Sequence, residues 1–170
     1  MKRVFKKIII WAAVFGFLVL AVRWFINQGP KGPDYSQTIP IQGANHIEVG
    51  SAHPVYNSNP PTSGWHYKDP AAIGFYPNGL PDEQLIHNLE HGEIWVSYHS
   101  RVPAETVKEL EKLAGGFAIV TKREANDKDI AVAAWGRLDK FNIDEVPNYL
   151  QRINDFILRY QNQGPEKVRM

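Results

Sequence analysis

The sequence predicts an α+β protein: a small mixed β-sheet packed by two to three helices and preceded by one N-terminal transmembrane helix. Three observations predict it. A long apolar run lies near the start of the chain, a Pro- and Gly-rich polar segment follows it, and beyond Pro81 short apolar segments alternate with segments of helical periodicity. That alternation runs in the order strand, helix, strand, strand, helix, which is typical of a sheet with helices packed against it.

We expect residues 1–28 to form a cytoplasmic tip and a transmembrane anchor. An uncharged apolar run extends from Ile8 to Val22, and with its apolar flanks, over residues 4–26, it approaches the roughly 20 residues that cross a bilayer. Trp11 and Trp24 suit the two membrane interfaces. The basic residues that precede the run should stay in the cytoplasm, and they are Lys2, Arg3, Lys6 and Lys7.

A cleaved signal peptide is the alternative for this segment. The residues after the run, Leu20 to Trp24, form a poor small-x-small cleavage site, and this favours an uncleaved signal-anchor. We therefore expect a single-pass protein of the cell membrane, with its N-terminus in the cytoplasm and its C-terminal domain outside the cytoplasm. The membrane is the expected partner, and no protein partner follows from the sequence.

We expect residues 29–44 to form a linker. Residues 45–166 should form an extracytoplasmic, histidine-rich α+β domain. Glycine and proline in the linker break both helices and strands. The first part of the domain is irregular, and the segment from Asn59 to Tyr67 is its centre. Two consecutive prolines there restrict the backbone and reduce the entropy that the loop loses on folding. We expect this stiff loop to present His66.

The domain becomes regular after Pro81. Acidic residues follow that proline, as in the first turn of a helix, and Gly92 can end the helix. The last helix follows Pro147, carries an apolar stripe, and ends before Gly164. The other expected elements are strands at residues 93–99, 117–121 and 130–136 and a helix at residues 103–114.

Composition excludes several classes of function and site. The formal charge of +1 argues against a nucleic-acid-binding protein, which would carry a basic surface. The absence of cysteine excludes disulfides, thiolate metal ligands and a cysteine nucleophile. Methionine occurs only at the two chain ends, so a Met-rich copper site is excluded as well. Histidine and carboxylate ligands remain, and imidazoles suit Zn²⁺ or Cu²⁺.

The histidines point to such a metal site. All six lie between positions 46 and 99. His87 and His91 are four residues apart in the first expected helix of the domain, so their side chains are neighbours within reach of one ion. His66 on the stiff loop is the third candidate ligand, and His46 is the fourth. His53, His99 and Glu90 are further candidate ligands, ranked below these four.

Two other interpretations stay open. The segment from His87 to His91 matches the H-x-x-E-H pattern of inverted zinc peptidases, in which Glu90 would activate water, so a metal-dependent hydrolase is an alternative. So short a pattern recurs by chance, and a non-enzymatic function is the expectation. In the other interpretation the domain is a structural part of the cell envelope, and its histidines form only hydrogen bonds. The further carboxylate ligand of a peptidase would have to be Glu105, Glu109 or Glu111.

Several short motifs follow one another along the chain. They are Pro60–Gly64 with His66, Gly74-x-Tyr76, His87–Gly92 and Ala134–Arg137. In this order they resemble the domain-of-unknown-function family 3105 over roughly residues 45–166. The resemblance implies a prokaryotic protein with one N-terminal anchor. Trp65 stands where the family pattern has proline, but both helix histidines and the positions of His46 and His66 have counterparts. The family carries no assigned reaction, so the resemblance marks an important region and not an activity.

Together these observations predict a membrane-anchored extracytoplasmic domain that binds a divalent metal ion. The expected ion is Zn²⁺ or Cu²⁺, and the expected function is metal handling or a metal-dependent interaction. The expected ligands are His46, His66, His87 and His91.

Overall fold

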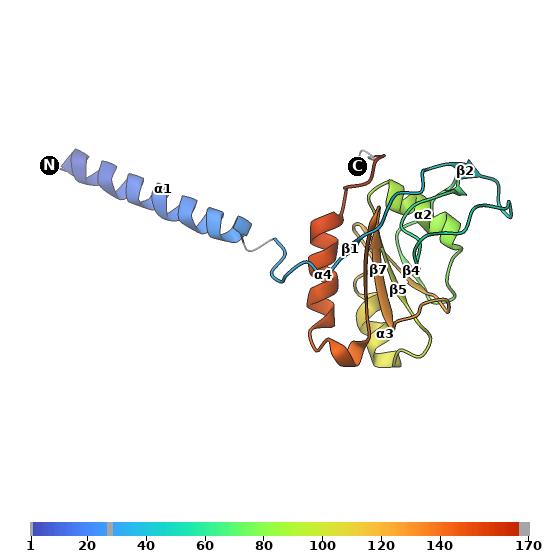
Figure 1. The fold of residues 1–170 in the computed structure, drawn as a ribbon. Helices are drawn as coiled ribbons and strands as arrows, with labels where there is room; N and C mark the ends of the chain where they lie inside the picture. The colour runs from blue at the N-terminus through green and yellow to red at the C-terminus, as the bar shows by residue number, and fades with distance from the viewer. Residues whose placement is uncertain (1, 27–28, 167–170) are drawn as a thin grey trace. The chain divides into compact units, whose positions relative to one another are not determined.

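The computed structural model describes residues 2–26 and 29–166, which belong to two compact units divided between Lys31 and Gly32. The first unit holds helix α1 (Lys2–Ile26). The second holds every other element shown in Figure 1. In chain order these are β1 (Gln37–Thr38), β2 (His46–Ile47), β3 (His66–Tyr67), β4 (Phe75–Tyr76), α2 (Asp82–Glu90), β5 (Ile94–Tyr98), α3 (Ala104–Glu111), β6 (Ala118–Lys122), β7 (Ile130–Ala134), β8 (Arg137–Phe141), a 3-10 helix (Ile143–Glu145) and α4 (Tyr149–Tyr160).

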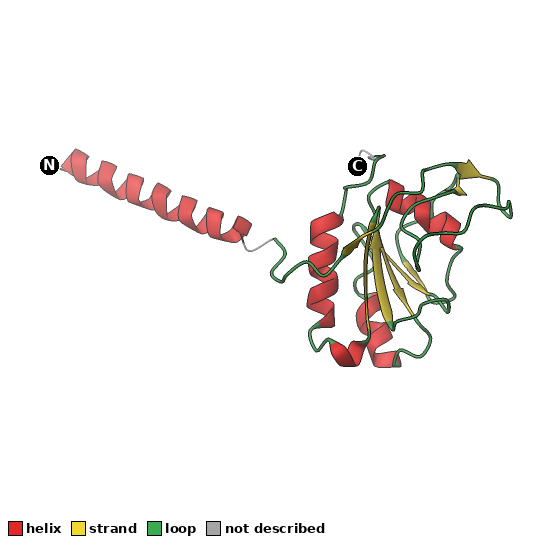
Figure 2. Cartoon of the chain, viewed as in Figure 1, coloured by secondary structure: helices red, strands yellow, loops and turns green. Residues whose placement is uncertain are grey.

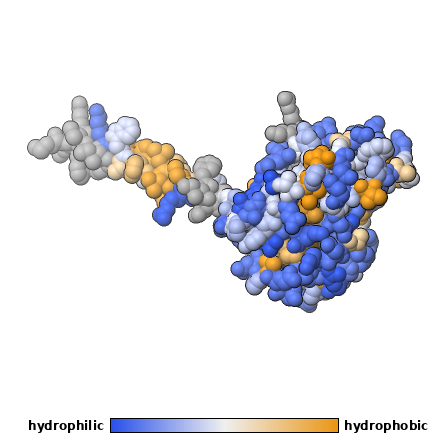
Figure 3. Space-filling model, in the orientation of Figure 1, coloured by the Kyte–Doolittle hydropathy of each residue, from blue (hydrophilic) through white to orange (hydrophobic). Residues whose placement is uncertain are grey.

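Helix α1 coincides with the segment predicted to cross a membrane. Its apolar side chains are exposed, with Trp11 at 71% and Phe17 at 72% (Figure 3). Within the described part of the chain, no helix is long and apolar enough to cross a membrane. The transmembrane helix predicted over residues 4–26 is therefore not confirmed. Residues 1, 27 and 28 of the predicted anchor segment lie outside the described residues.

Six strands of the second unit form one mixed sheet in the order β1-β8-β7-β5-β6-β4. Strands β4 and β5 both run parallel to β6, whereas the other neighbouring pairs are antiparallel. The parallel β5–β6 pair requires a crossover, and α3 lies within it. The predicted α+β class and mixed sheet are confirmed. The helices and strands expected after Pro81 all form, within a few residues of their predicted bounds.

Strand β8 is the one strand after Pro81 that the sequence analysis does not predict. It pairs with β7 through a tight turn at Gly136, whose φ of 67° lies in the left-handed region that glycine adopts readily. Charged residues alternate with Leu138 and Phe141 in this strand, so it has no continuous apolar run. Asp139 is nevertheless buried, on the same side of the strand as Phe141, and accepts two hydrogen bonds from Arg152 on α4.

Both faces of the sheet are covered, and the covering helices come from different parts of the chain (Figure 2). Side chains alternate along β5, so that Ile94 and Val96 join the core under α3 and α4 while Trp95 joins the core under α2. Helix α2 contributes Leu85 and Leu89 to this second core. The sheet therefore fixes α2, which carries the H-x-x-E-H segment, on the face opposite the last helix.

The segment predicted as a linker packs onto the domain. Strand β1 pairs with β8 at the sheet edge, with Gln37 opposite Leu138, and the Gly32 amide donates a 2.7 Å hydrogen bond to the buried Asp155 carboxylate. From Gly32 onward, residues 29–44 therefore belong to the compact unit. Glycine and proline make the segment irregular, but the edge of β8 offers unpaired backbone groups that β1 satisfies.

Replacing Phe156 by alanine should destabilise the second unit by about 3–5 kcal/mol, because its ring is 3% exposed in the core between α4 and the sheet. Urea unfolding of the full chain measures the free energy. Leu158→Ala is the matched control, since Leu158 lies on the same helix and is 40% exposed, and it should change little. Equal losses in the two variants would show that the apolar stripe of α4 does not anchor the helix.

Candidate metal site

Two short strands bring His46 and His66 together. Strands β2 and β3 pair in parallel with His46 opposite His66, and the His66 amide donates a 2.9 Å hydrogen bond to the Asn45 carbonyl. The two imidazole centroids are 4.9 Å apart, with the rings nearly perpendicular. Residues 20 positions apart in the sequence thus meet on one face of a two-stranded ladder.

The loop before His66 is buried and held by hydrogen bonds. Residues Pro60–Gly64 are all buried, and the Ser63 hydroxyl accepts a 3.0 Å hydrogen bond from the Gln42 amide. Gly64 has a φ of +126°, and a Cβ there would lie 3.0 Å from the Tyr56 ring, so the position requires glycine. The Gly64 carbonyl accepts a 2.8 Å hydrogen bond from His66 Nδ1. The loop thus holds His66 in a defined position, with its side chain completely buried.

Helix α2 supplies His87 and Glu90 from the side away from its apolar core face. Both side chains are buried, since β3 covers this side of the helix. The Tyr67 carbonyl accepts a 2.8 Å hydrogen bond from His87 Nδ1. Asn88 holds the helix to the neighbouring loop through a reciprocal pair of hydrogen bonds with the Ala71 backbone, at 2.8 and 2.9 Å.

These hydrogen bonds define the protonation of two imidazoles. A carbonyl oxygen only accepts, so Nδ1 of His66 and Nδ1 of His87 must each carry a proton. In the neutral rings the remaining nitrogen, Nε2, then has a free lone pair. Metal-binding histidines use the same arrangement, in which the second ring nitrogen donates to a backbone carbonyl and orients the ligand.

Three histidines converge closely enough to hold a metal ion. One nitrogen from each of His46, His66 and His87 lies within 4.8 Å of the others. A tetrahedral zinc ion with Zn–N distances of about 2.0–2.1 Å separates its ligands by roughly 3.4 Å, so modest ring rotations would bring the three nitrogens to one ion. His46 and His87 already stack nearly parallel, at a centroid distance of 4.9 Å.

Glu90 places a carboxylate oxygen beside His66 without a hydrogen bond between them. Its Oε2 lies 2.9 Å from His66 Nε2 and 3.8 Å from His46 Nε2. The 2.9 Å separation suits an ion pair, but the angles form no hydrogen bond, and both buried atoms lack a hydrogen-bond partner among the described residues. Two such acceptors facing each other are unfavourable when both are unprotonated, and a cation between them would satisfy both.

A second group of ligands adjoins the first and shares His87. The Nε2 atoms of His87 and His91 are 3.0 Å apart, and Glu166 Oε2 lies 3.8 Å from His91 Nε2. One ligand atom from each of these three residues lies within 4.8 Å of the others. Glu166 is a site residue that the sequence analysis does not identify, since no motif surrounds it and only tertiary structure brings it near His91.

The C-terminal segment reaches this position by close backbone contact with the end of α2. The Asn162 amide donates to the Gly92 carbonyl at 2.7 Å, and the Glu166 amide donates to the Glu90 carbonyl at 3.1 Å. A Cβ at Gly164 would lie 2.0 Å from the same Glu90 oxygen, so a side chain there is incompatible with this packing. Helix α4 ends earlier, at Tyr160, and glycine at position 164 lets the tail approach the site.

Burial favours the neutral form of two of the imidazoles, which is the form that binds a metal. Burial is the largest cause that lowers the pKa of His66, although the Gly64 hydrogen bond and the Glu90 carboxylate oppose it. Burial likewise lowers the pKa of His91, and the neighbouring His87 adds to the effect. A lowered pKa weakens proton competition for the ring nitrogen near neutral pH.

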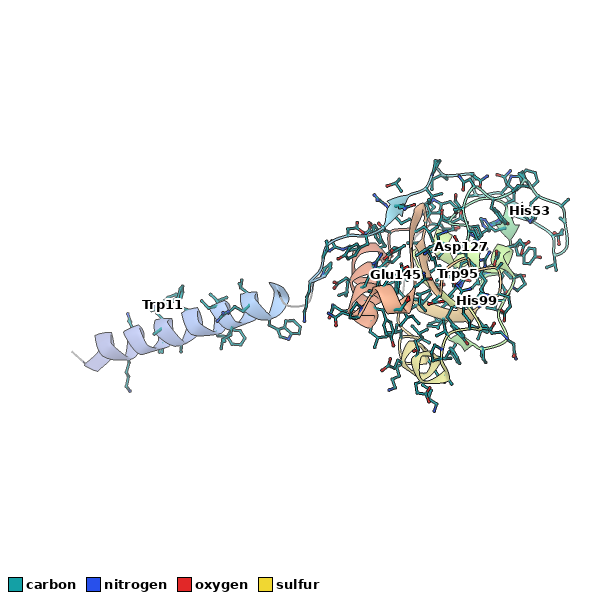
Figure 4. The ribbon with its side chains drawn as sticks, turned by 60° about the horizontal axis from the view of Figure 1, so that its bottom comes forward. Trp11, His53, Trp95, His99, Asp127 and Glu145 are labelled. Atoms are coloured by element: carbon teal, nitrogen blue, oxygen red, sulfur yellow. The ribbon has the colours of Figure 1, made fainter. Side chains whose placement is uncertain are left out.

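The remaining candidate residues lie outside both groups. His53 pairs with Glu83 at 3.1 Å, and His99 lies 3.8 Å from Glu124 (both histidines are labelled in Figure 4). On α3, Glu109 accepts a hydrogen bond from Tyr149 instead. Among the described residues, Glu105, Glu109 and Glu111 belong to neither ligand group, so the H-x-x-E-H match gains no second-helix ligand and no further support for hydrolysis.

The chain belongs to the family described as "Protein of unknown function (DUF3105)", whose profile matches residues 46–169. The matched region includes both ligand groups and the whole sheet except β1. Neither the curated proteins nor the solved structures contain a match to the chain. Family membership, predicted from the ordered motifs, is confirmed, and the function must be argued from the site.

The metal-free protein should lose stability as the pH falls below about 6.5, the ordinary pKa of histidine. Below that value the unfolded chain takes up protons that His66 and His91 still refuse in the fold, so protonation favours unfolding. The stabilisation is fully present above about pH 6.5 and is lost as the pH falls toward the lowered folded pKa values, by at most about 1.4 kcal/mol per histidine per pH unit.

Urea unfolding with a chelator present, at about pH 7.5 and about pH 5.5, measures this loss. The variant His91→Gln removes one of the two titrating groups and should show a smaller difference between the two conditions. An unchanged difference in that variant would contradict the assigned contribution of His91.

Proposed function

We propose that the domain binds one divalent metal ion, Zn²⁺ or Cu²⁺, through its histidine cluster, and that it serves metal handling or a metal-dependent interaction. His46, His66 and His87 are the ligands that meet in one place, and His91 is the fourth imidazole, next to His87. Neutral imidazole is a ligand that both ions prefer.

The facing pair of His66 and Glu90 carries the proposal. A purely structural histidine normally makes a hydrogen bond with its buried ring nitrogens, yet Nε2 of His66 is fully buried, faces a carboxylate oxygen, and neither atom has a hydrogen-bond partner among the described residues. A bound cation gives both atoms a partner. The carboxylate either completes the coordination or balances the charge of the ion from beside it.

The affinity of the tag-free full chain for Zn²⁺ or Cu²⁺ tests the proposal by calorimetric titration. His46→Ala, His66→Ala and His87→Ala should each weaken binding by at least about tenfold, or roughly 1.4 kcal/mol, because each removes one of three converging ligands. His53→Ala and His99→Ala are matched controls and should leave the affinity within about threefold of the wild type.

Elemental analysis of the purified chain gives an independent reading of bound metal. If the wild type binds neither ion more tightly than the variant lacking all three ligands, the metal function is wrong. The structural-domain interpretation then takes its place, with the histidines acting only through hydrogen bonds.

We also propose that residues 4–26 attach the chain to the cell membrane, with the N-terminus cytoplasmic and the metal-binding domain on the other side. The exposed apolar side chains of α1 favour such a contact, and they include Trp11, Phe15, Phe17 and Leu20. The basic residues at the start of α1 favour a cytoplasmic N-terminus.

A reporter fused to the C-terminus should be active only outside the cytoplasm and should sediment with membranes that have been washed at alkaline pH. Changing the four basic residues Lys2, Arg3, Lys6 and Lys7 to glutamate should reduce the activity of the outer reporter, because the orienting charge is lost. A soluble, shortened product would instead indicate a cleaved signal peptide.

A further inference from the structure

The two ligand groups cannot each bind a metal ion at the same time, because both would use the same nitrogen atom of His87. His87 belongs to the group with His46 and His66 and also to the group with His91 and Glu166. Its Nδ1 donates a hydrogen bond to the Tyr67 carbonyl, so only Nε2 remains for a metal. An ion bound to His87 therefore occupies either the inner group (His46, His66, His87) or the outer group (His87, His91, Glu166).

The two groups differ in access to solvent. In the inner group the His66 side chain is completely buried, and the buried Glu90 carboxylate lies beside it. In the outer group Glu166 is exposed over 60% of its side chain and bears a carboxylate that attracts a cation from solution. His91 lies between these extremes, at 16% exposure. His46 of the inner group is also exposed, over 45% of its side chain, so the two groups differ in which ligand meets solvent: a carboxylate in the outer group and an imidazole in the inner one.

The outer group depends on a specific conformation of the chain. Asn162 has a left-handed φ of 57°, and Gly164 passes the end of α2 where no Cβ fits. Backbone hydrogen bonds at both ends of this turn, to Gly92 and to Glu90, hold the tail. The position of Glu166 near His91 is consequently defined by the fold at its backbone, even though its side chain is exposed.

We propose that His91 and Glu166 form a capture position, from which the ion passes to His46 and His66 by exchange of ligands around His87. This inference rests on the proposed metal-binding function. The ion keeps its bond to His87 Nε2 while His91 and Glu166 are replaced by the inner imidazoles. Before the ion binds, the 3.0 Å hydrogen bond to the unprotonated Nε2 of His87 requires the His91 proton on Nε2. On capture the His91 ring passes to the tautomer with its proton on Nδ1 by proton exchange with water, so the exchange of ligands requires no other reactant.

Rates distinguish a capture residue from a ligand of the final site. The dissociation constant is the ratio of the release and loading rates, so losing a shared route slows both rates and leaves the ratio unchanged. Losing a ligand of the final site mainly speeds release and weakens binding. Glu166→Gln should therefore slow both loading and release by about tenfold or more, with the dissociation constant within about threefold of the wild type.

Stopped-flow mixing of the full, tag-free chain with Cu²⁺ provides the measurement. The Trp135 ring lies 6.4 Å from the His66 ring, so quenching of its fluorescence reports arrival at the inner group, and Trp135→Phe identifies that signal. Glu124→Gln is the matched control, because Glu124 is similarly exposed and lies 3.8 Å from His99, the same distance as Glu166 from His91. It should leave both rates unchanged.

The titration endpoint should be one Cu²⁺ per chain. A second equivalent bound by the wild type but not by Glu166→Gln would overturn the shared-ion proposal. Unchanged rates in Glu166→Gln, or weaker binding with faster release, would overturn it too, while leaving the proposed metal function intact. A wild type that binds no Cu²⁺ and no Zn²⁺ would instead refute the proposed function itself.

Discussion

Two hydrogen bonds from imidazole rings to backbone carbonyls give the histidine cluster its shape. Both acceptors, the carbonyls of Gly64 and Tyr67, belong to one short stretch of chain, and that stretch lies against α2. Each bond uses Nδ1 and leaves Nε2 as the one nitrogen of the ring that could bind an ion, so the fold alone orients both rings. The buried loop from Pro60 to Gly64, the β2–β3 pair and the docking of α2 on the sheet all keep this stretch in place.

The histidine cluster contains an unfavourable buried contact, between His66 and Glu90, and the rest of the fold must offset its cost. A buried polar atom without a partner costs about 1–3 kcal/mol, and His66 and Glu90 each present one. The sheet, packed by helices on both faces, supplies the apolar burial that offsets this cost. Under the proposed function a bound cation removes this cost, so the contact that weakens the metal-free fold would favour metal binding.

The helices and strands predicted correctly are those whose sequence signal is local. Five elements form as predicted because the signal for each lies within one segment. These signals are the apolar stripe of α4, the capping proline and glycine of α2, and the apolar runs of β5, β6 and β7. The strands that the sequence does not predict are those whose formation depends on a partner element. Strand β1 is two residues long and exists because β8 offers an edge, and β8 is recognisable only once its charged side is paired with α4.

The sequence by itself determined the class of fold, the family, and the set of residue types able to bind a metal, because composition and periodicity are local properties of the chain. It also placed His87 and His91 side by side, since helical spacing makes them neighbours. Only the tertiary structure decided that His46 lies opposite His66 and that Glu166 returns to His91 from the far end of the domain. Those contacts depend on strand register and on the path of the tail, which many distant residues set together and no single segment encodes.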